Sequence, residues 1–203
     1  MAQSFADDPH SEDGSVCPRN FFGFTSYERL KEKEALYVPG RAFELTFRPV
    51  PGNFDTGHLQ KIHWYLFRDI FPWAGKLRVV DIAKPGGASF AHYEFIASSL
   101  TALFAELKEE RQLVGLDASA FANRAAYYLG EINAAHPFRE GNGRTQREFI
   151  RTLALHAGHT LVWDTLQPDE NTAASILSHT RRDNTGLARM IAAAIKESMR
   201  LQE

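Results

Sequence analysis

The sequence predicts a mainly α-helical fold, a helical bundle with one short β-hairpin. Several stretches repeat apolar residues with the helical period, helix-capping residue types precede some of them, and one β-branched run leads into a "KPGG" turn. The chain has 203 residues, of which 44% are hydrophobic and 24% charged, so it can bury a sizeable core as one domain. We expect residues 19–203 to form that domain and residues 1–18, rich in Asp, Ser and Glu, to form a flexible N-terminal arm.

The first predicted helix is short and charged. It covers residues 26–35 and takes Ser26 as its N-cap. The segment that follows mixes Pro, Gly and apolar residues, and it predicts no particular element. The next helix covers residues 56–71, where Pro72 ends it. Its buried face is expected to consist of Leu59, Ile62, Leu66, Phe67 and Ile70.

The hairpin is predicted in residues 76–93, "KLRVVDIAKPGGASFAHY". Val79, Val80 and Ile82 favour a strand because β-branched side chains pack well on a pleated surface. The "KPGG" stretch supplies the turn, since glycine adopts the backbone angles that hairpin turns need.

Helices dominate the rest of the chain. One covers residues 94–113, and a second covers residues 116–135 with Asp117 as its N-cap. A third covers residues 144–159 and ends near Gly158, and residues 171–201 form one or two more. The buried faces of the first two are expected to be Ile96, Leu100, Leu103, Phe104 and Leu107, and Phe121, Ala125, Tyr128, Leu129 and Ile132.

The composition argues against several function classes. A formal net charge of −2 does not suggest a protein that coats nucleic acid or an anionic membrane. The single cysteine, Cys17, cannot form an internal disulfide, which is compatible with a reducing compartment. No apolar stretch is long enough for a transmembrane helix, and the polar N-terminus lacks the apolar core of a signal peptide. We therefore expect a cytoplasmic protein.

The segment "HPFREGNGRTQREF", from His136 to Phe149, concentrates unusual chemistry. Pro137 cannot continue the incoming helix, because it has no amide donor and its ring clashes with the preceding turn. The residue before a proline is also disfavoured in helical geometry, so His136 should lie at the helix end and face a loop.

The outgoing helix should start near Asn142, a favourable N-cap. Gly141 and Gly143 allow unusual backbone angles and the close approach of another group. Backbone amides at a helix N-terminus are unsatisfied, and the helix dipole favours an anion there. The pattern therefore predicts an anion site.

Charged side chains complete the pattern. Arg144, Arg147 and Arg151 follow at helical spacing and suit phosphate oxygens. Glu140 would repel phosphate unless a Mg²⁺ ion lies between them. Together these residues describe a nucleotide phosphate site, with His136 as the general base because an imidazole titrates near neutral pH.

Each of these features also has an ordinary structural explanation. Gly-Asn-Gly at a helix start is often only a capped turn, and an arginine stripe is often a solvated face. Three classes therefore remain open: an enzyme, a nucleotide-binding interaction module without catalysis, and a small helical nucleic-acid binder. The net charge of −2 weighs against the third class.

The segment resembles the Fic (filamentation induced by cyclic AMP) family, whose motif is HPF-x-[DE]-G-N-G-R-x-x-R. Every motif position is present, from His136 to Arg147. Upstream, "IHWYLFRDIFPWAGKLRVVDIAK" is similar to the family's segment that leads into its target-binding hairpin, the flap. The resemblance extends over roughly residues 20–200.

The resemblance implies a Fic fold with the flap beside the active site. It also implies transfer of AMP from ATP to a hydroxyl side chain of a target protein (AMPylation), with Mg²⁺. The implied roles are His136 as the base, Phe138 as buried packing, Glu140 as the Mg²⁺ ligand, Gly141, Asn142 and Gly143 as the anion hole, and Arg144 and Arg147 as phosphate ligands. The implied target-docking residues of the flap are Asp81, Ile82, Ala83, Lys84, Ser89 and Phe90.

Two further implications concern activity and regulation. Doc-type kinases of this superfamily carry a lysine at the position of Gly143, so the resemblance favours AMP transfer, with a Fic transferase of another nucleotide or moiety as the alternative. Many Fic enzymes carry an inhibitory helix of pattern [ST]-x-x-x-E-[GN], which neither end of this chain supplies. We therefore expect a toxin restrained by a separate small antitoxin. Two alternatives stay open: an absent or divergent restraint, and a chain that is part of a longer effector.

Resemblance to stand-alone bacterial Fic toxins suggests gyrase B and its topoisomerase IV counterpart as targets. Residues 178–190 lie in the general region of the family's nucleoside pocket, but they match no residue-level motif for adenine.

Overall fold

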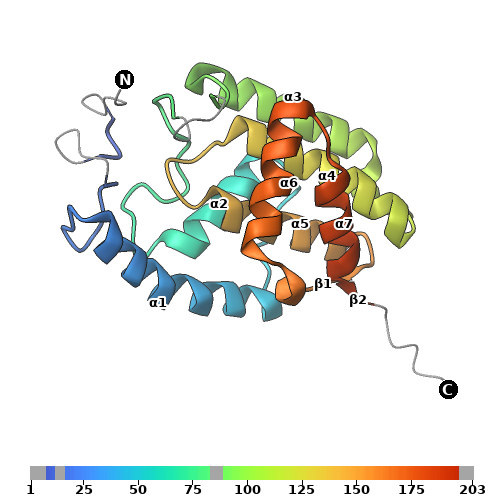
Figure 1. Ribbon diagram of the computed structural model, residues 1–203, viewed down its shortest axis with the longest axis horizontal. Helices are drawn as coiled ribbons and strands as arrows, with labels where there is room; N and C mark the ends of the chain where they lie inside the picture. The colour runs from blue at the N-terminus through green and yellow to red at the C-terminus, as the bar shows by residue number, and fades with distance from the viewer. Residues whose placement is uncertain (1–7, 12–16, 83–88, 197–203) are drawn as a thin grey trace.

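A computed structural model describes residues 8–11, 17–82 and 89–196. The described chain is mainly helical, as the sequence predicts (Figure 1). Its elements are α1 (Tyr27–Phe47), α2 (Thr56–Phe67), η1 (Tyr93–Phe95), α3 (Ile96–Glu109), η2 (Arg111–Leu113), α4 (Ala118–Ala135), α5 (Asn142–His156), β1 (Thr160–Leu161), η3 (Trp163–Thr165), α6 (Pro168–Arg181), α7 (Thr185–Ala194) and β2 (Ile195–Lys196). None of the described helices combines the length and the apolarity needed to cross a membrane.

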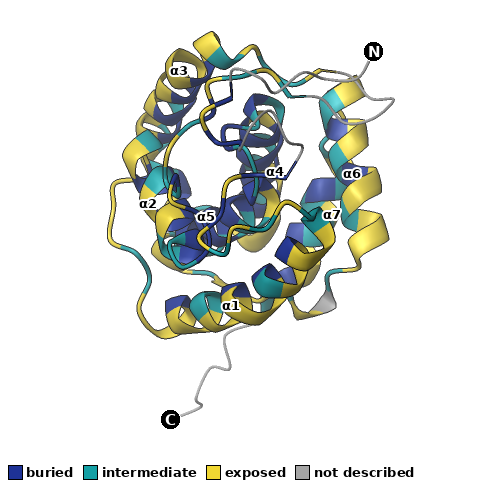
Figure 2. Ribbon diagram, turned by 90° about the vertical axis from the view of Figure 1, so that its left-hand side faces the viewer, coloured by how far each residue is buried: buried dark blue, intermediate teal, exposed yellow. Residues whose placement is uncertain are grey.

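Helices α4 and α5 form the centre of the bundle. Helix α4 packs against α3, α5, α6 and α7, while α2 packs against α5, α1 and α3. Figure 2 shows α4 and α5 largely buried, whereas α1, α3 and α6 expose their outer faces. The connection between the two central helices is the segment that carries the sequence motif.

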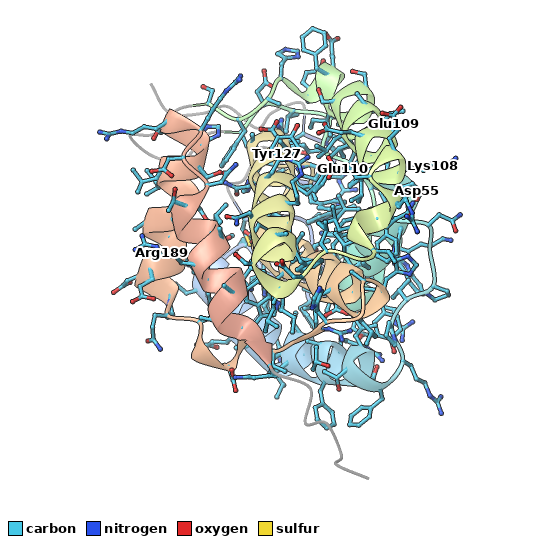
Figure 3. The ribbon with its side chains drawn as sticks, turned by 90° about the vertical axis from the view of Figure 1, so that its right-hand side faces the viewer. Asp55, Lys108, Glu109, Glu110, Tyr127 and Arg189 are labelled. Carbon is cyan, nitrogen blue, oxygen red and sulfur yellow. The ribbon has the colours of Figure 1, made fainter. Side chains whose placement is uncertain are left out.

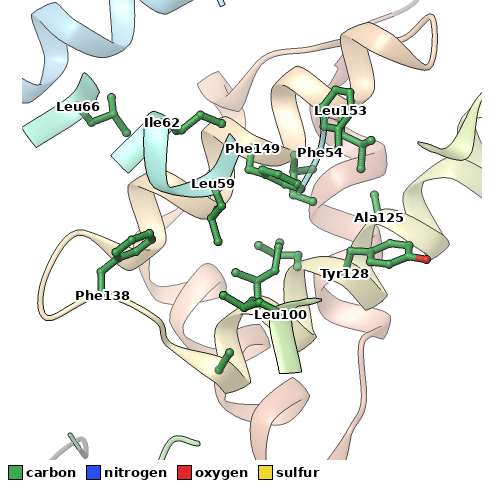
Figure 4. Close-up of a cluster of buried hydrophobic side chains, with 14 of the residues drawn as sticks. Phe54, Leu59, Ile62, Leu66, Leu100, Ala125, Tyr128, Phe138, Phe149 and Leu153 are labelled. Atoms are coloured by element: carbon green, nitrogen blue, oxygen red, sulfur yellow. The ribbon is translucent and has the colours of Figure 1, made fainter. Parts of the chain in front are cut away.

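The core consists of the apolar faces that periodicity predicts. All five predicted residues of α3 and all five of α4 are at most 8% exposed. The predicted face of residues 56–71 is at most 1% exposed, although α2 ends at Phe67 and leaves Ile70 outside the helix. Phe149 of α5 joins this face in the cluster shown in Figure 4. Burying each large apolar side chain stabilises this arrangement by roughly 1.5–3 kcal/mol.

Polar side chains join α3 to α4 at the end of α3. Arg124 donates to Glu110 at 2.9 Å, and the Tyr127 hydroxyl donates to Glu106 at 3.0 Å. Figure 3 shows Tyr127 on α4 and Glu110 at the end of α3. Arg124 lies in the first half of α4 and Tyr127 at its middle, so these bonds are away from His136 at the end of the helix.

Helix α1 is longer than the sequence predicts. The Ser26 hydroxyl accepts from the Arg29 amide at 3.5 Å, so the predicted cap is confirmed, but the helix continues to Phe47 instead of ending at residue 35. Pro39 lies inside it, where it removes one hydrogen bond and disfavours helix. Buried Val38 and Leu45, on the turns before and after the proline, offset that cost by packing on the core.

Of the predicted hairpin, the described residues show one bridge residue, Ser89, and no continuous strand. Its turn, residues 83–88, lies outside the described residues, and residues 76–82 contain neither helix nor strand. The two-stranded antiparallel sheet joins β1 to β2, with Leu161 opposite Ile195. The backbone groups of the predicted arms bond elsewhere: the Arg78 amide donates to Pro137 O at 2.9 Å and the Ala91 amide donates to Ala134 O at 3.1 Å. Both acceptors lie at the end of α4.

The described part of the predicted N-terminal arm packs on the fold. Residues 8–11 lie close to the motif loop, since Arg139 donates to the Asp8 carboxylate at 2.7 Å. His10 stacks on Trp73, with ring centroids 5.1 Å apart. The division of the chain at residue 18 stays a prediction.

Candidate active site

The chain reverses direction between α4 and α5, and His136 lies at the start of that reversal. It caps α4 with φ 43° and ψ 62°, in the left-handed region, and its amide still donates to Ile132 O at 3.0 Å. Pro137 follows, so the helix cannot continue. The imidazole therefore faces the loop, as the sequence predicts, although the backbone is left-handed where an extended one is more usual before proline.

The side chain of Asn142 holds the loop closed. It donates to Phe138 O at 2.7 Å and accepts from the Phe138 amide at 2.9 Å. Asn142 was expected to be the N-cap of α5, and this was wrong: Gly141 is the N-cap, with φ 81°, and Asn142 is the first helical residue. A Cβ at Gly141 would lie 2.4 Å from the Phe67 ring, so both the backbone angle and the space require glycine.

His63 of α2 contacts the same loop at two residues. Its ring stacks on Phe138 with centroids 3.9 Å apart, and Nε2 donates to Glu140 O at 3.0 Å. Nδ1 accepts from the Gly75 amide at 2.8 Å, so this nitrogen carries no proton and the ring is neutral. Burial lowers the pKa of His63 to about 3. Phe138 itself is 1% exposed and reaches from the loop toward the core cluster (Figure 4).

A cavity of about 130 Å³ opens beside the loop. His136, Gly143 and Arg147 line it, so the structure brings the predicted base together with two of the predicted phosphate ligands. The opposite wall comes from α6, whose polar residues are Asn171, Thr172 and Ser175. This volume is below the 300–1,000 Å³ of a typical small-molecule site, so the enclosed part fits one portion of a nucleotide.

The guanidinium of Arg147 is desolvated. Burial lowers the pKa of Arg147, and the nearby positive charge of Arg144 lowers it further. Within the described ranges, no carboxylate lies within 4.0 Å of it. A buried cation without a counter-charge is costly, and an anion in the adjoining cavity would compensate it.

Glu140 is held by groups on both sides of its carboxylate. One oxygen accepts from the Gly141 amide at 2.8 Å, and the other accepts from the Tyr27 hydroxyl at the start of α1. Burial and the Glu140 charge raise the pKa of Tyr27, so the phenol stays protonated and serves as a donor. The carboxylate side chain remains 23% exposed.

Arg144 faces α1. It donates to the carboxylate of Glu34, lies 3.5 Å from Glu140, and places its guanidinium over the Phe67 ring at 4.7 Å from the centroid. Glu34 is buried, and burial raises the pKa of Glu34 while Arg144 opposes that shift. Arg151, the third arginine of the predicted stripe, pairs with Glu148 at 2.7 Å. Only Arg147 of the three therefore lines the cavity with His136.

Sequence reasoning missed several of these residues. Tyr27 and Glu34 are seven residues apart, so they lie on one face of α1, and this spacing was the available signal. Nothing in the local sequence links them to Glu140 and Arg144, more than a hundred positions away. Asn171, Thr172 and Ser175 carried no recognisable motif.

The predicted target-docking segment lies next to His136. The Phe90 ring stacks on the imidazole, with centroids 3.8 Å apart and planes at 17°. Asp81 accepts from the Tyr93 amide at 2.9 Å, which ties one arm of the segment to the other. Ile82 and Ser89 are also described, whereas Ala83 and Lys84 lie outside the described residues.

Comparison with protein families decides the classification. The model of the Fic/DOC family matches residues 53–154, which contain α2, α3, α4, the motif loop and most of α5. The chain belongs to the Fic/DOC family.

Curated relatives of the chain carry the name of one activity. Protein adenylyltransferase VbhT of Bartonella schoenbuchensis is 45% identical over 174 residues, which cover 86% of this chain and 36% of VbhT. "Probable protein adenylyltransferase Fic" of Escherichia coli K12 is 37% identical, covering 83% of this chain and 84% of that protein. The sequence-based expectation of an enzyme of the adenylyltransferase class agrees with these names. The chain spans just over a third of VbhT.

Solved structures share the fold. BepC of Bartonella tribocorum, with bound AMPPNP, matches with a TM-score of 0.86 and 28% identity over 92% of this chain and 96% of that one. The N-terminal Fic domain of a Bep effector of Bartonella quintana, with bound ADP, also matches with a TM-score of 0.86 and 28% identity, over 92% and 94%. The predicted Fic fold is confirmed.

The neutral, buried His63 generates a prediction about stability and pH. A folded-state pKa of about 3 lies below the ordinary value of 6.5, so His63 contributes stability that is complete above pH 6.5 and is lost as the pH falls toward 3. The free energy of unfolding, measured by urea titration between pH 3.5 and 7, should fall more steeply for the wild type than for His63→Phe. His156→Phe, at an exposed position, is the control and should keep the wild-type slope. Equal slopes for all three proteins would contradict this assignment.

The two arginines generate opposite predictions about stability. Arg144→Met leaves the buried Glu34 carboxylate without its partner and should lower the free energy of unfolding by about 1–3 kcal/mol. Arg147→Met removes a desolvated cation that has no described counter-charge, so it should leave stability unchanged or raise it. Urea unfolding of both variants, without nucleotide, measures the difference. A larger loss for Arg147→Met than for Arg144→Met would show that the charge assignments are wrong.

Proposed function

We propose that this protein transfers AMP from ATP to a hydroxyl side chain of a target protein, with His136 as the general base. One observation carries the proposal. The desolvated guanidinium of Arg147 lines a cavity together with the imidazole of His136 and the start of α5, which places a cation, a base and helix-terminal amides around one small volume. The names of the relatives, and the AMPPNP and ADP bound to the neighbouring structures, support a nucleotide as the anion.

The proposed chemistry is an in-line displacement. Nδ1 of His136 is buried, so Nε2 is the ring atom that takes the proton of the target hydroxyl. The oxygen then forms a bond to the α-phosphorus of ATP, the bond from that phosphorus to the bridging oxygen breaks, and pyrophosphate leaves. Positioning and charge stabilisation supply most of the rate in such phosphate chemistry.

The start of α5 is the proposed anion hole. The first intrahelical bond runs from the Thr145 amide to Gly141 O at 3.1 Å, so the amides of Asn142, Gly143 and Arg144 have no acceptor within the helix. The helix dipole adds positive potential there. Arg147 neutralises the terminal phosphate, and Arg144 steadies the phosphates from the α1 side.

Glu140 is the residue that would hold Mg²⁺. Its carboxylate is partly exposed beside the proposed phosphate site and keeps oxygen lone pairs beyond those used by Gly141 and Tyr27. Oxygen donors of this kind fit Mg²⁺, which is commonly bound by one or two carboxylates plus phosphates. A bound Mg²⁺ would offset the charge of the phosphates.

The polar wall of α6 is proposed to contact the nucleoside part of ATP. Asn171, Thr172 and Ser175 offer hydroxyl and amide groups to the cavity that contains His136. A nucleotide-binding module without catalysis would use the same residues, but it would not need an imidazole in the cavity. A nucleic-acid binder would need an exposed basic face, whereas Arg144 and Arg151 are paired with Glu34 and Glu148.

The protein target is proposed to dock on the segment around Asp81, Ile82, Ser89 and Phe90. This segment lies against His136 through Phe90, and an extended peptide could pair with its backbone. Gyrase B and the corresponding topoisomerase IV subunit, in the cytoplasm, stay our candidate targets.

Regulation by a separate antitoxin is part of the proposal. A partner helix that presents a glutamate would pair with Arg147, whose guanidinium has no described carboxylate partner. This pairing would compete with the terminal phosphate of ATP and so restrain a toxin.

His136→Ala should abolish transfer and leave ATP binding nearly intact, because the imidazole is proposed to touch the hydroxyl and not the nucleotide. Loss of a general base costs about 10²–10⁴-fold. Mass spectrometry of the target for the addition of one AMP measures transfer, and calorimetry measures ATP affinity. Near wild-type transfer by a folded His136→Ala protein would remove His136 as the base.

Glu140→Gln should weaken the dependence of activity on Mg²⁺ and lower activity without unfolding the chain, because the amide keeps the shape but loses the charge. Transfer rates across a Mg²⁺ titration test this, with circular dichroism as the folding control. An unchanged Mg²⁺ titration would show that Glu140 is not the ligand.

The chain alone should modify its target, and a small protein with a helix of pattern [ST]-x-x-x-E-[GN] should suppress that activity. Changing the glutamate of this helix to glycine should restore transfer while the two proteins still bind. The test is a transfer assay with each form of the small protein. A folded chain that binds ATP but is inert alone would contradict the antitoxin proposal.

A further inference from the structure

Arg78 is among the largest fully buried side chains of the described residues, although it is a cation. It is 1% exposed as a residue, and its side chain is completely enclosed. It lies 11 residues after the end of α2, in the arm that leads into the target-docking segment. Its position in a loop and its complete burial together require an explanation, because burying an uncompensated charge is costly.

The guanidinium of Arg78 binds four backbone carbonyls from two parts of the chain. Two belong to the end of α4: Nε donates to His136 O at 2.8 Å, and Nη2 donates to Ala135 O at 3.2 Å. Two belong to the docking segment: Nη1 donates to Val80 O at 2.7 Å, and Nη2 also donates to Ala91 O. One planar group therefore connects both arms of the docking segment to the residue that carries the proposed base.

These carbonyls compensate the charge, and an ion pair with Asp81 adds to them. Asp81 is the carboxylate near Arg78, at 3.6 Å, and its side chain is 54% exposed, so its interaction is screened by solvent. The end of α4 offers a better environment, because a helix C-terminus carries unsatisfied carbonyls and partial negative charge. Burial lowers the pKa of Arg78, but an arginine remains protonated.

We propose that Arg78 is a positioning residue that fixes the docked target relative to His136. The inference rests on the proposed AMP transfer. A target peptide bound to the segment around Val80 and Ala91 presents its hydroxyl to the imidazole of His136. The backbone carbonyl of His136 accepts from the same guanidinium that holds this segment. The distance between hydroxyl and base is then set by Arg78, and not by the nucleotide pocket, which Arg78 does not line.

The test is a comparison of Arg78→Lys with Arg124→Lys. Lysine keeps the charge but lacks the planar fork, so it cannot hold four carbonyls in this geometry. Arg124 lies on α4 itself, 12 residues from His136, or about 18 Å along the helix. It binds Glu106 and Glu110. Both proteins are assayed for kcat and KM with a protein target, for ATP affinity by calorimetry, and for folding by circular dichroism.

Arg78→Lys should lower kcat/KM for the protein target at least about tenfold, since a displacement of about 1 Å can cost 10²-fold, while the dissociation constant for ATP stays within about twofold of wild type. Arg124→Lys should keep wild-type kinetics. Wild-type kcat/KM in a folded Arg78→Lys protein would overturn the inference, and so would a parallel loss of ATP affinity, which would indicate general structural damage.

A second variant covers the case in which Arg78→Lys does not fold. Arg78→Gln keeps a planar group with N–H donors but carries no charge, so it avoids the cost of burying a lysine ammonium. It should lower kcat/KM for the target at least about tenfold, with unchanged ATP affinity, because one amide group cannot donate to all the carbonyls that Arg78 holds. Wild-type kcat/KM in a folded Arg78→Gln protein would overturn the inference. If the wild type itself binds ATP but transfers no AMP to any target, the proposed function fails, and this outcome is separate from a failure of the Arg78 inference.

Discussion

The candidate site depends on the two hydrogen bonds between the Asn142 side chain and the backbone of Phe138. By bonding both the amide and the carbonyl of Phe138, this side chain closes the reversal between α4 and α5 into a short rigid loop. The closed loop has three consequences. His136 is held in a left-handed conformation at the end of α4, Gly143 at the start of α5 lines the same cavity as His136, and the Glu140 carboxylate accepts from the Gly141 amide. A helix end alone could provide an anion site, and the closed loop adds the imidazole of His136 to the same cavity.

Other parts of the chain stabilise this loop and offset the strain of its backbone. A non-glycine residue in the left-handed region is strained, and His136 is one. Arg78 binds its carbonyl, and Phe90 packs on its ring. From α2, His63 binds the Glu140 carbonyl and stacks on Phe138, while Tyr27 of α1 fixes the Glu140 carboxylate. Arg78, His63 and Tyr27 therefore satisfy three polar groups of the loop, whereas the guanidinium of Arg147 has no described carboxylate partner and leaves a charge for a ligand to satisfy.

The sequence predicts local features of this fold well and long-range ones poorly. The faces of α3 and α4 and the cap at Asp117 follow from periodicity and from hydrogen bonding within a few residues, so they were predicted correctly. The extension of α1 was missed because Pro39 disfavours helix locally, and only tertiary packing reveals what offsets it. The strand expected at Val79 and Val80 is absent because the guanidinium of Arg78 and the end of α4 take up backbone groups that a hairpin would pair.

The motif supplies the local residues of the candidate site but not their contacts with distant segments. Residues 136–147 are contiguous, so their chemistry could be inferred together, whereas the pairs Tyr27–Glu140 and Glu34–Arg144 join distant segments. The expected stripe of three arginines divides into one that lines the cavity and two that pair with carboxylates, a difference that helical spacing cannot show. The most direct measurement of the central claim uses ATP labelled on either the α- or the γ-phosphate, with the purified chain and candidate targets. AMP transfer predicts covalent label on protein from α-labelled ATP, and none from γ-labelled ATP. Label from γ-labelled ATP alone would mean phosphate transfer, and it would contradict the account.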